Sequence, residues 1–376
     1  MKESQLPTPY YIVYEDKLRR NLDLIADVSR RSGAHIIMAF KANALWRTFP
    51  IFREYGVAFT ASSLNELELG RRHLGTKAHT YTPAYTDATI DRYLEGSSHI
   101  TFNSLDQLRR FGARAHAKGV SVGLRVNPQC SVIETDIYNP ALPGSRFGVT
   151  AEDLPEYPVE GLDGLHFHAL CESSSYDLEK VLEAFEKQFG HLLPNLKWVN
   201  MGGGHLMTRE GYDTEHLIRL LSDFRRRHPN LEVILEPGSA FTWRTGDLVT
   251  SVVDIVENQG VKTAIIDASF ACHMPDTLEM PYQPAITESV APASGLPAYR
   301  LGGNSCLSGD FCGPWSFAEE LKAGQRLRLE DMNHYTTVKT TMFNGLQHPD
   351  IVLCDHDGDC TYLRRFDYSD YESRMS

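Results

Sequence analysis

The stretch AHIIMAFKANALWRTFPIFREYGVAFTAS, residues 34–62, decides the fold class of this chain. Its first segment, AHIIMAF (34–40), is a short apolar run typical of a buried strand, and VAFTAS (57–62) repeats that pattern. Between them, FPIFREYG (49–56) has the apolar spacing of a helix and ends at a glycine. A strand, a helix and a second strand in this order predict a βαβ unit with parallel strands.

The same alternation continues on both sides of this unit. A predicted helix over 15–33 precedes it, and six more strand candidates follow: KAHTYTPA (77–84), HITFN (99–103), VSVGLRVNP (120–128), LDGLHFHAL (162–170), LKWVNMGGG (196–204) and LEVILEPG (231–238). Eight strand–helix units are the number that closes a (β/α)₈ TIM barrel. A doubly wound open sheet is the alternative, because periodicity does not show closure. The lack of a G-x-G-x-x-G motif after the first strand weighs against the open sheet.

The pattern changes after residue 240. Five segments there have the two-residue alternation of strands with turn signals between them: residues 247–260, 261–269, 326–330, 331–343 and 350–366. We therefore expect an α/β chain with a (β/α)₈ barrel over 15–240 and a β-rich C-terminal domain over 241–376. The strand-like N-terminal residues 1–14 are expected to join the β-rich domain.

Composition excludes several classes of protein. The chain has 376 residues, 42% apolar and 23% charged, as ordinary globular proteins do. Its net charge of −12 argues against a nucleic-acid-binding surface and is compatible with a cationic small ligand. No apolar run is long enough for a membrane span, and the N-terminus lacks a signal-peptide core, so we expect a cytoplasmic protein. Seven cysteines without a C-x-x-C pair suggest reduced thiols rather than a disulfide scaffold.

In a (β/α)₈ barrel the active site gathers where the strands end at their carboxyl side. Polar residues that follow the predicted strands are therefore the candidates for chemistry. These are Lys41, the segment from Ser63 to Glu66, Arg125, His168, Gly202 to Gly204, and Glu236.

Each candidate also has a plainer structural explanation. Lys41 could form a salt bridge, the glycines could make a tight turn, and Glu236 could be a buried carboxylate with a structural partner. His168 and His166 share one face of a strand, but without a third ligand signature we expect no metal. Taken together, a lysine at a strand end, a phosphate-binding glycine loop, a buried carboxylate and a flat imidazole are the parts that hold pyridoxal 5′-phosphate.

Seven motifs carry a resemblance to a known family. They are AFKAN at Lys41, ASSLNELELG at Glu66, FHALCE at His168, GGG at 202–204, EPG at 236–238, CLSGD at 306–310 and EDMNHYTTVKTTMFNG at 330–345. In this order they resemble the fold type III pyridoxal-phosphate decarboxylases over nearly the whole chain. HFHALCE, HMPDTLEMPYQP and HYTTVKTTMFNG are similar to the branch that decarboxylates carboxylated polyamines, giving norspermidine or spermidine. A decarboxylase of meso-diaminopimelate or of another basic amino acid is the alternative.

The resemblance implies a role for each candidate toward the cofactor. Lys41 binds pyridoxal phosphate covalently, and Glu66 lies near it. His168 stacks on the ring, and Glu236 faces the ring nitrogen. The remaining implied contacts are Arg125 beside that carboxylate, and Gly202, Gly203, Gly204 and Tyr335 at the phosphate.

The resemblance also implies contacts with the substrate and with a second subunit. Cys306 returns a proton to the substrate, usually across the interface of a homodimer with shared active sites. Asp310, with Glu279 and Asp276, binds the distal ammonium groups of a polyamine, since desolvated cations require carboxylate partners. Two other classes stay open: a non-catalytic member that only binds the cofactor, and an alanine-racemase-like enzyme. Non-catalytic members typically lose the lysine or the proton donor. The CLSGD motif belongs to the decarboxylase branch rather than to the alanine-racemase-like enzymes.

Overall fold

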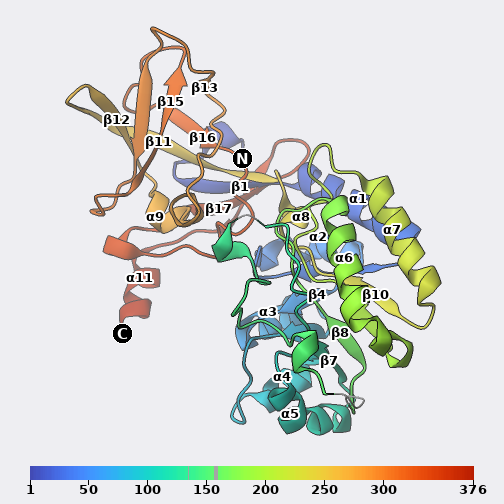
Figure 1. Ribbon diagram of the computed structural model, residues 1–376. Helices are drawn as coiled ribbons and strands as arrows, with labels where there is room; N and C mark the ends of the chain where they lie inside the picture. The colour runs from blue at the N-terminus through green and yellow to red at the C-terminus, as the bar shows by residue number, and fades with distance from the viewer. Residues whose placement is uncertain (134, 156–159) are drawn as a thin grey trace. The chain divides into compact units, whose positions relative to one another are not determined.

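The computed structural model describes residues 1–133, 135–155 and 160–376, and it divides into two compact units. The first unit consists of Met1–Arg20 and Thr242–Ser376. The second unit, Asn21–Phe241, holds the strands predicted for the barrel. Figure 1 shows both, and each is described by itself.

Parallel strands form the sheet of the second unit. They are β2 (His35–Ile36), β3 (Met38–Ala39), β4 (Phe59–Ala61), β5 (Ala78–Tyr81), β6 (Ser97–Phe102), β7 (Ser121–Arg125), β8 (Gly164–His166), β9 (Trp198–Asn200) and β10 (Glu232–Leu235). From β3 to β10 each strand pairs with the next in sequence, and β10 pairs with β2. Every segment predicted as a barrel strand therefore contains a strand.

The first predicted strand closes the barrel because it is divided between two neighbours. The N–H of Ile37 donates to the carbonyl of Leu235 on β10 at 2.9 Å, and the N–H of Met38 donates to the carbonyl of Ala58 before β4 at 2.9 Å. The five residues 35–39 thus pair with β10 on one side and with β4 on the other. This confirms the barrel and rules out the open sheet.

Helices alternate with these strands, and α5, α6 and α7 lie outside them in Figure 1. The helices are α1 (Glu15–Ser32), α2 (Phe49–Glu54), α3 (Leu64–His73), α4 (Ile90–Gly96), α5 (Leu105–Ala117), α6 (Ser175–Phe189), α7 (Thr214–Arg227) and α8 (Ser239–Thr242). Short 3₁₀ turns occur at Trp46–Thr48, Asp136–Tyr138, Ala151–Asp153 and Gly190–Asn195. Serine side chains cap the N-termini of α3, α5 and α6, where they accept backbone N–H groups that have no partner within the helix.

A tryptophan fills part of the barrel interior. The Trp198 indole donates to the Ser121 hydroxyl at 2.9 Å. A Cβ at Gly123 or Gly164 would lie 2.3 Å or 2.0 Å from the Trp198 ring. These two strand glycines are required because the ring occupies the space where their side chains would stand.

The other unit is built on a mixed sheet. Its strands are β1 (Tyr10–Tyr14), β11 (Gly246–Asn258), β12 (Val261–Ile266), β13 (Ser289–Val290), β14 (Ala298–Gly302), β15 (Phe311–Phe317), β16 (Arg326–Leu329), β17 (Asp350–Cys354) and β18 (Cys360–Arg364). The main order is β13-β15-β14-β12-β11-β1-β17-β18, and β16 also pairs with β11. Its helices are α9 (Phe270–His273), α10 (Asp276–Glu279) and α11 (Tyr368–Met375), with 3₁₀ turns at Glu3–Gln5 and Phe343–Gly345. The N-terminal strand β1 lies between β11 and β17.

Two expectations about this unit are wrong. Residues 331–343 form turns instead of a strand, because Asp331 and Tyr335 have φ angles of 61° and 57°, which extended backbone does not adopt. Cys354 and Cys360 form a disulfide rather than reduced thiols. These cysteines face each other directly in the antiparallel register of β17 and β18. None of the described helices combines the length and the apolar character that crossing a membrane requires.

Candidate active site

Lys41 lies two residues beyond the end of β3, in a turn at the carboxyl end of the barrel strands. Its ammonium forms no hydrogen bond or ion pair with any residue that the structure describes, which excludes the structural salt bridge. The side chain reaches solvent, yet the protein atoms around it make desolvation the main cause that lowers its pKa. Glu236 opposes this shift, and Arg125 reinforces it. Lys41 is therefore a free amine whose pKa lies below that of an ordinary lysine.

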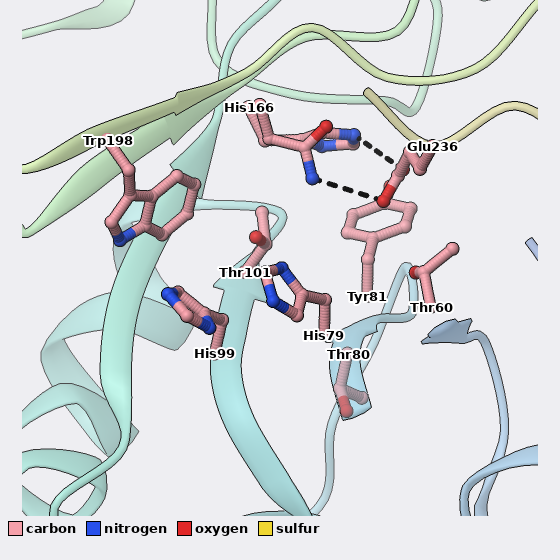
Figure 2. A pocket seen from close by; sticks show the side chains of 10 residues that line it. Thr60, His79, Thr80, Tyr81, His99, Thr101, His166, Trp198 and Glu236 are labelled. Carbon is pink, nitrogen blue, oxygen red and sulfur yellow. Dashed lines mark hydrogen bonds and ion pairs between the residues drawn. The ribbon is translucent and has the colours of Figure 1, made fainter. Parts of the chain in front are cut away.

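Glu236 lies beyond the end of β10, and both of its carboxylate oxygens have a protein partner (Figure 2). His166, the last residue of β8, contacts Oε1 through Nε2 at 2.9 Å, and the Asn200 amide of β9 donates to Oε2 at 3.1 Å. Desolvation alone would raise the pKa of Glu236. The interactions with His166 and Asn200 outweigh it and lower that pKa, so Glu236 is ionised.

His168 lies two residues beyond the end of β8. The N–H of Gly203 donates to its Nδ1 at 3.0 Å, so the remaining imidazole proton belongs on Nε2. Desolvation, followed by the charge of Lys41, lowers the pKa of His168 well below its usual value. The ring is thus a neutral, flat surface held at one edge by the backbone.

The glycine loop is only partly free to bind a phosphate, which corrects our expectation for Gly202 and Gly203. The N–H of Gly202 donates to Asn200 Oδ1 at 2.8 Å, and the N–H of Gly203 donates to His168. These side chains lie close enough to take the amides because they end the neighbouring strands. Gly204 forms no such hydrogen bond through its N–H within the described chain.

All three glycines are required by close packing as well. A Cβ at Gly203 would lie 2.6 Å from the Glu236 carbonyl oxygen. At Gly204, where φ is +90°, a Cβ would lie 2.3 Å from the carbonyl group of Leu170. The loop therefore passes tightly between the segments that carry His168 and Glu236.

Arg125 ends β7 and is 4% exposed. Its guanidinium lies over the ring of Tyr81 at 4.7 Å and over the ring of Phe147 at 4.5 Å. It also donates to the carbonyl of His168 at 3.3 Å. The direct partners of Glu236 are His166 and Asn200, so Arg125 acts on that carboxylate through its charge.

Glu66 occupies the first turn of α3 and has a capping role that sequence reasoning did not assign. Its carboxylate accepts the N–H of Ser62 at 2.6 Å, and its own N–H donates to the Ser63 hydroxyl at 3.2 Å. Desolvation raises the pKa of Glu66, whereas the Ser62 N–H and the charge of Lys41 lower it. Glu66 is thus within the electrostatic range of Lys41, as expected.

Beneath Glu236 the barrel interior contains a small hollow. Its lining is unusually polar for a barrel core and consists of Thr60, His79, Thr80, Tyr81, His99, Thr101, His166, Trp198, Asn200 and Glu236. His79 and His99 stack there with ring centroids 4.0 Å apart. Desolvation lowers the pKa of His79 to about 3, so this ring is neutral. His79 on β5 and His99 on β6 are paired in register, and one histidine in each of two consecutive predicted strands was the available sequence signal.

The other five predicted site residues belong to the unit that contains residues 242–376, and three of them have protein partners that we did not expect. Asp276 and Glu279 both form salt bridges with Lys339 instead of standing free. The Asp310 carboxylate is 4% exposed and accepts hydrogen bonds from Ser269, Ser305 and the Ala271 N–H. Lys339 thus neutralises two of these carboxylates, and hydrogen-bond donors of the same unit enclose the third.

Cys306 and Tyr335 remain compatible with their predicted roles. The Cys306 side chain is exposed, and its N–H donates to Asn344 Oδ1 at 2.7 Å. Tyr335 is half-buried, with the left-handed backbone already noted. In the described residues, no cluster of three or more His, Cys, Asp or Glu side chains is arranged to hold a metal ion.

Comparison with known proteins agrees with this geometry. Residues 16–243 match the family described as pyridoxal-dependent decarboxylase, pyridoxal binding domain. A carboxyaminopropylagmatine decarboxylase from Synechocystis sp. is 43% identical over 372 residues, which cover 99% of this chain and 96% of the relative. A carboxynorspermidine/carboxyspermidine decarboxylase from Campylobacter jejuni is 41% identical over 381 residues, covering 98% and 99%.

A solved structure is also similar over nearly the whole chain. It is the carboxynorspermidine decarboxylase of Campylobacter jejuni complexed with norspermidine, which matches with a TM-score of 0.91 and 39% identity. The match covers 98% of this chain and 100% of that one. Diaminopimelate decarboxylases are more distant, at 23–26% identity.

Proposed function

Because the chain belongs to the pyridoxal-dependent decarboxylase family, we propose that it converts carboxynorspermidine or carboxyspermidine to norspermidine or spermidine in polyamine biosynthesis. The observation that carries the proposal is Lys41, a free amine beside an ionised carboxylate at the carboxyl end of the barrel. Such an amine is the nucleophile that a carbonyl cofactor requires.

The residues present fit pyridoxal 5′-phosphate, the cofactor of the family. The site combines the Lys41 amine, the neutral His168 ring and the Glu236 carboxylate, and the Gly203 N–H holds one edge of the His168 ring in place. Lys41 would bind the cofactor covalently, and Glu236 would face its ring nitrogen. The Gly204 N–H and the Tyr335 hydroxyl are our candidates for the phosphate.

The cofactor, when bound, supplies a sink for the electron pair left by the departing carboxylate. The chain supplies charge and orientation. Glu236 would stabilise a proton on the ring nitrogen, and desolvation, more than the charge of Lys41, lowers the pKa of His168 and keeps its imidazole neutral. The Cys306 thiol would return a proton to the carbon that has lost its carboxylate.

Two further parts of the proposal concern assembly and location. We propose a homodimer with shared active sites, supported by the exposure of Cys306, and we place the enzyme in the cytoplasm. Mixing Lys41→Ala with Cys306→Ala protein tests the sharing. If subunits exchange at random and share sites, activity should return to about a quarter of the wild-type level. Mixtures that stay inactive despite exchange would contradict it.

Carboxyaminopropylagmatine is a second candidate substrate, favoured by the relative from Synechocystis sp. at 43% identity. It ends in a guanidinium, which prefers a single carboxylate gripped by two parallel hydrogen bonds, whereas an ammonium is a compact charge. A substrate-competition assay should compare it with carboxynorspermidine, carboxyspermidine, meso-diaminopimelate and ornithine. Since one methylene changes binding by only about 1–3 kcal/mol, the two carboxylated triamines should differ least. A clear preference for diaminopimelate would overturn the proposal.

Lys41→Ala tests the cofactor assignment directly. The variant should lose the near-visible absorbance of the lysine-bound cofactor and the release of CO₂. The control is Lys197→Ala, which removes a lysine whose side chain is exposed and paired with Asp163. A Lys41→Ala protein that keeps both the absorbance and full turnover would refute the assignment. Wild-type protein that binds the cofactor without releasing CO₂ would indicate a non-catalytic member.

A further inference from the structure

We infer that His166 is a positioning residue that orients the Glu236 carboxylate and keeps it ionised. The inference rests on the proposed function, because it concerns how Glu236 acts on the bound cofactor. Its basis is the arrangement around Glu236: the His166 imidazole contacts one carboxylate oxygen (Figure 2), and the Asn200 amide donates to the other.

The contacts fix both ends of the carboxylate. His166 Nε2 lies 2.9 Å from Oε1, and Asn200 Nδ2 lies 3.1 Å from Oε2. Asn200 is itself fixed, because its Oδ1 accepts the Gly202 N–H at 2.8 Å. A carboxylate can accept about four hydrogen bonds, so one lone-pair direction on each oxygen remains for a group on the cofactor side.

The hydrogen-bond pattern also assigns the proton of His166. An ionised carboxylate only accepts hydrogen bonds, so Nε2 must carry the proton that is donated to Oε1. Nδ1 is buried, and it has no partner among the described residues. Desolvation lowers the pKa of His166 while Glu236 raises it, so the neutral tautomer is favoured. Groups of this kind, which contact a functional residue from behind, commonly fix its orientation and tune its charge.

Simple packing is the competing explanation, since His166 is 1% exposed and lines the hollow within the barrel. His99 provides a matched control. It is an imidazole on β6, two strands away from β8 in the barrel, that lines the same hollow, stacks on His79 and has no hydrogen bond to Glu236. Replacing either histidine removes a ring from the hollow, but only the replacement of His166 removes a hydrogen-bond donor from Glu236.

The experiment compares His166→Leu, His166→Gln and His99→Leu in the cofactor-loaded enzyme. Leucine removes the N–H donor, whereas the glutamine amide can place its nitrogen near the position of Nε2. We measure kcat, KM, the dissociation constant of pyridoxal phosphate, and the absorbance band of the lysine-bound cofactor at constant pH. His166→Leu should lower kcat about 10- to 100-fold, the size of a lost hydrogen bond to a charged group, with KM nearly unchanged. It should also alter the absorbance band and weaken binding of the cofactor.

The same three variants also define the results that would contradict the inference about His166. His166→Gln should recover most of kcat and the wild-type band, and His99→Leu should keep both. If His166→Leu and His99→Leu lose activity alike with unaltered bands, or if His166→Gln falls as far as His166→Leu, the inference is wrong. Failure of the proposed function is a separate result, because wild-type enzyme would then show no lysine-bound cofactor or no release of CO₂.

Discussion

Replacing Gly238 by alanine tests how the loop that carries Lys41 is held. Gly238 belongs to the EPG segment after β10, and a Cβ there would lie 2.4 Å from the Cβ of Ala42, the residue after Lys41. The two segments are already tied together, because the Ala39 N–H donates to the Pro237 carbonyl at 3.1 Å. Ala42 is fully buried and cannot rotate away, so the backbone has to move.

The size of the effect follows from the contact distance. Carbon atoms pack at about 3.5 Å or more, so the Lys41 loop must shift by about 1 Å. Misplacement of a reacting group by about 1 Å can cost about 100-fold in rate, which corresponds to about 2.7 kcal/mol in the activation free energy. Overpacking should also lower the free energy of unfolding by about 1–3 kcal/mol. Steady-state decarboxylation and urea denaturation measure the two effects.

Two further variants sharpen this test. Gly190→Ala is the matched control, because no atom lies within 4 Å of its Cβ position, and we expect no loss of activity. Ala42→Gly combined with Gly238→Ala removes the opposing methyl group and should recover much of the rate. Gly238→Ala with wild-type kcat/KM, or a double variant no better than the single one, would refute the reasoning.

Three more predictions concern stability and redox state. Gly164→Ala should lower the free energy of unfolding by about 1–3 kcal/mol in urea denaturation, because its Cβ would lie 2.0 Å from the Trp198 ring; an unchanged midpoint would show that the ring can move. Desolvation raises the pKa of Asp163, but hydrogen bonds outweigh it and lower this pKa to about 2. The stability that the ionised Asp163 carboxylate contributes is therefore present above about pH 4 and is lost between pH 4 and pH 2. Asp163→Asn should therefore cost about 1–2 kcal/mol at pH 7, allowing for solvent screening, and should flatten the stability profile below pH 4. Thiol titration of denatured protein should find five thiols before reduction and seven after it; seven before reduction would contradict the Cys354–Cys360 disulfide.

The barrel could be predicted because its strands are buried on both faces and therefore read as continuous apolar runs. The polar residue after each run was predictable for the same reason, since strand ends in a barrel point to one site. Lys41, His168 and Glu236 were found in this way. Closure was not predictable from periodicity, because it depends on the division of one strand between β4 and β10.

The interaction partners of the candidate residues were harder to predict than their positions in the fold. A carboxylate such as Glu279 is equally suited to a ligand and to Lys339, and only the folded chain shows which cation is near. The sequence placed His166 on one strand face with His168, but only the structure shows that its partner is Glu236. The turns over 331–343 alternate like a strand in sequence, but their left-handed residues break the extended backbone. In each case contacts between distant segments decide the outcome.

The divided first strand has a consequence for how the protein is made. Residues 35–39 are synthesised well before their partner on one side, β10, which ends at Leu235. At a synthesis rate of about 5–20 residues per second, about 10–40 s pass before the ring of strands can close. During that interval the growing barrel has two unpaired edges, which are sites for association with other chains. The segment that leads to Lys41 is thus synthesised before the other barrel strands and is among the last to have both of its edges paired.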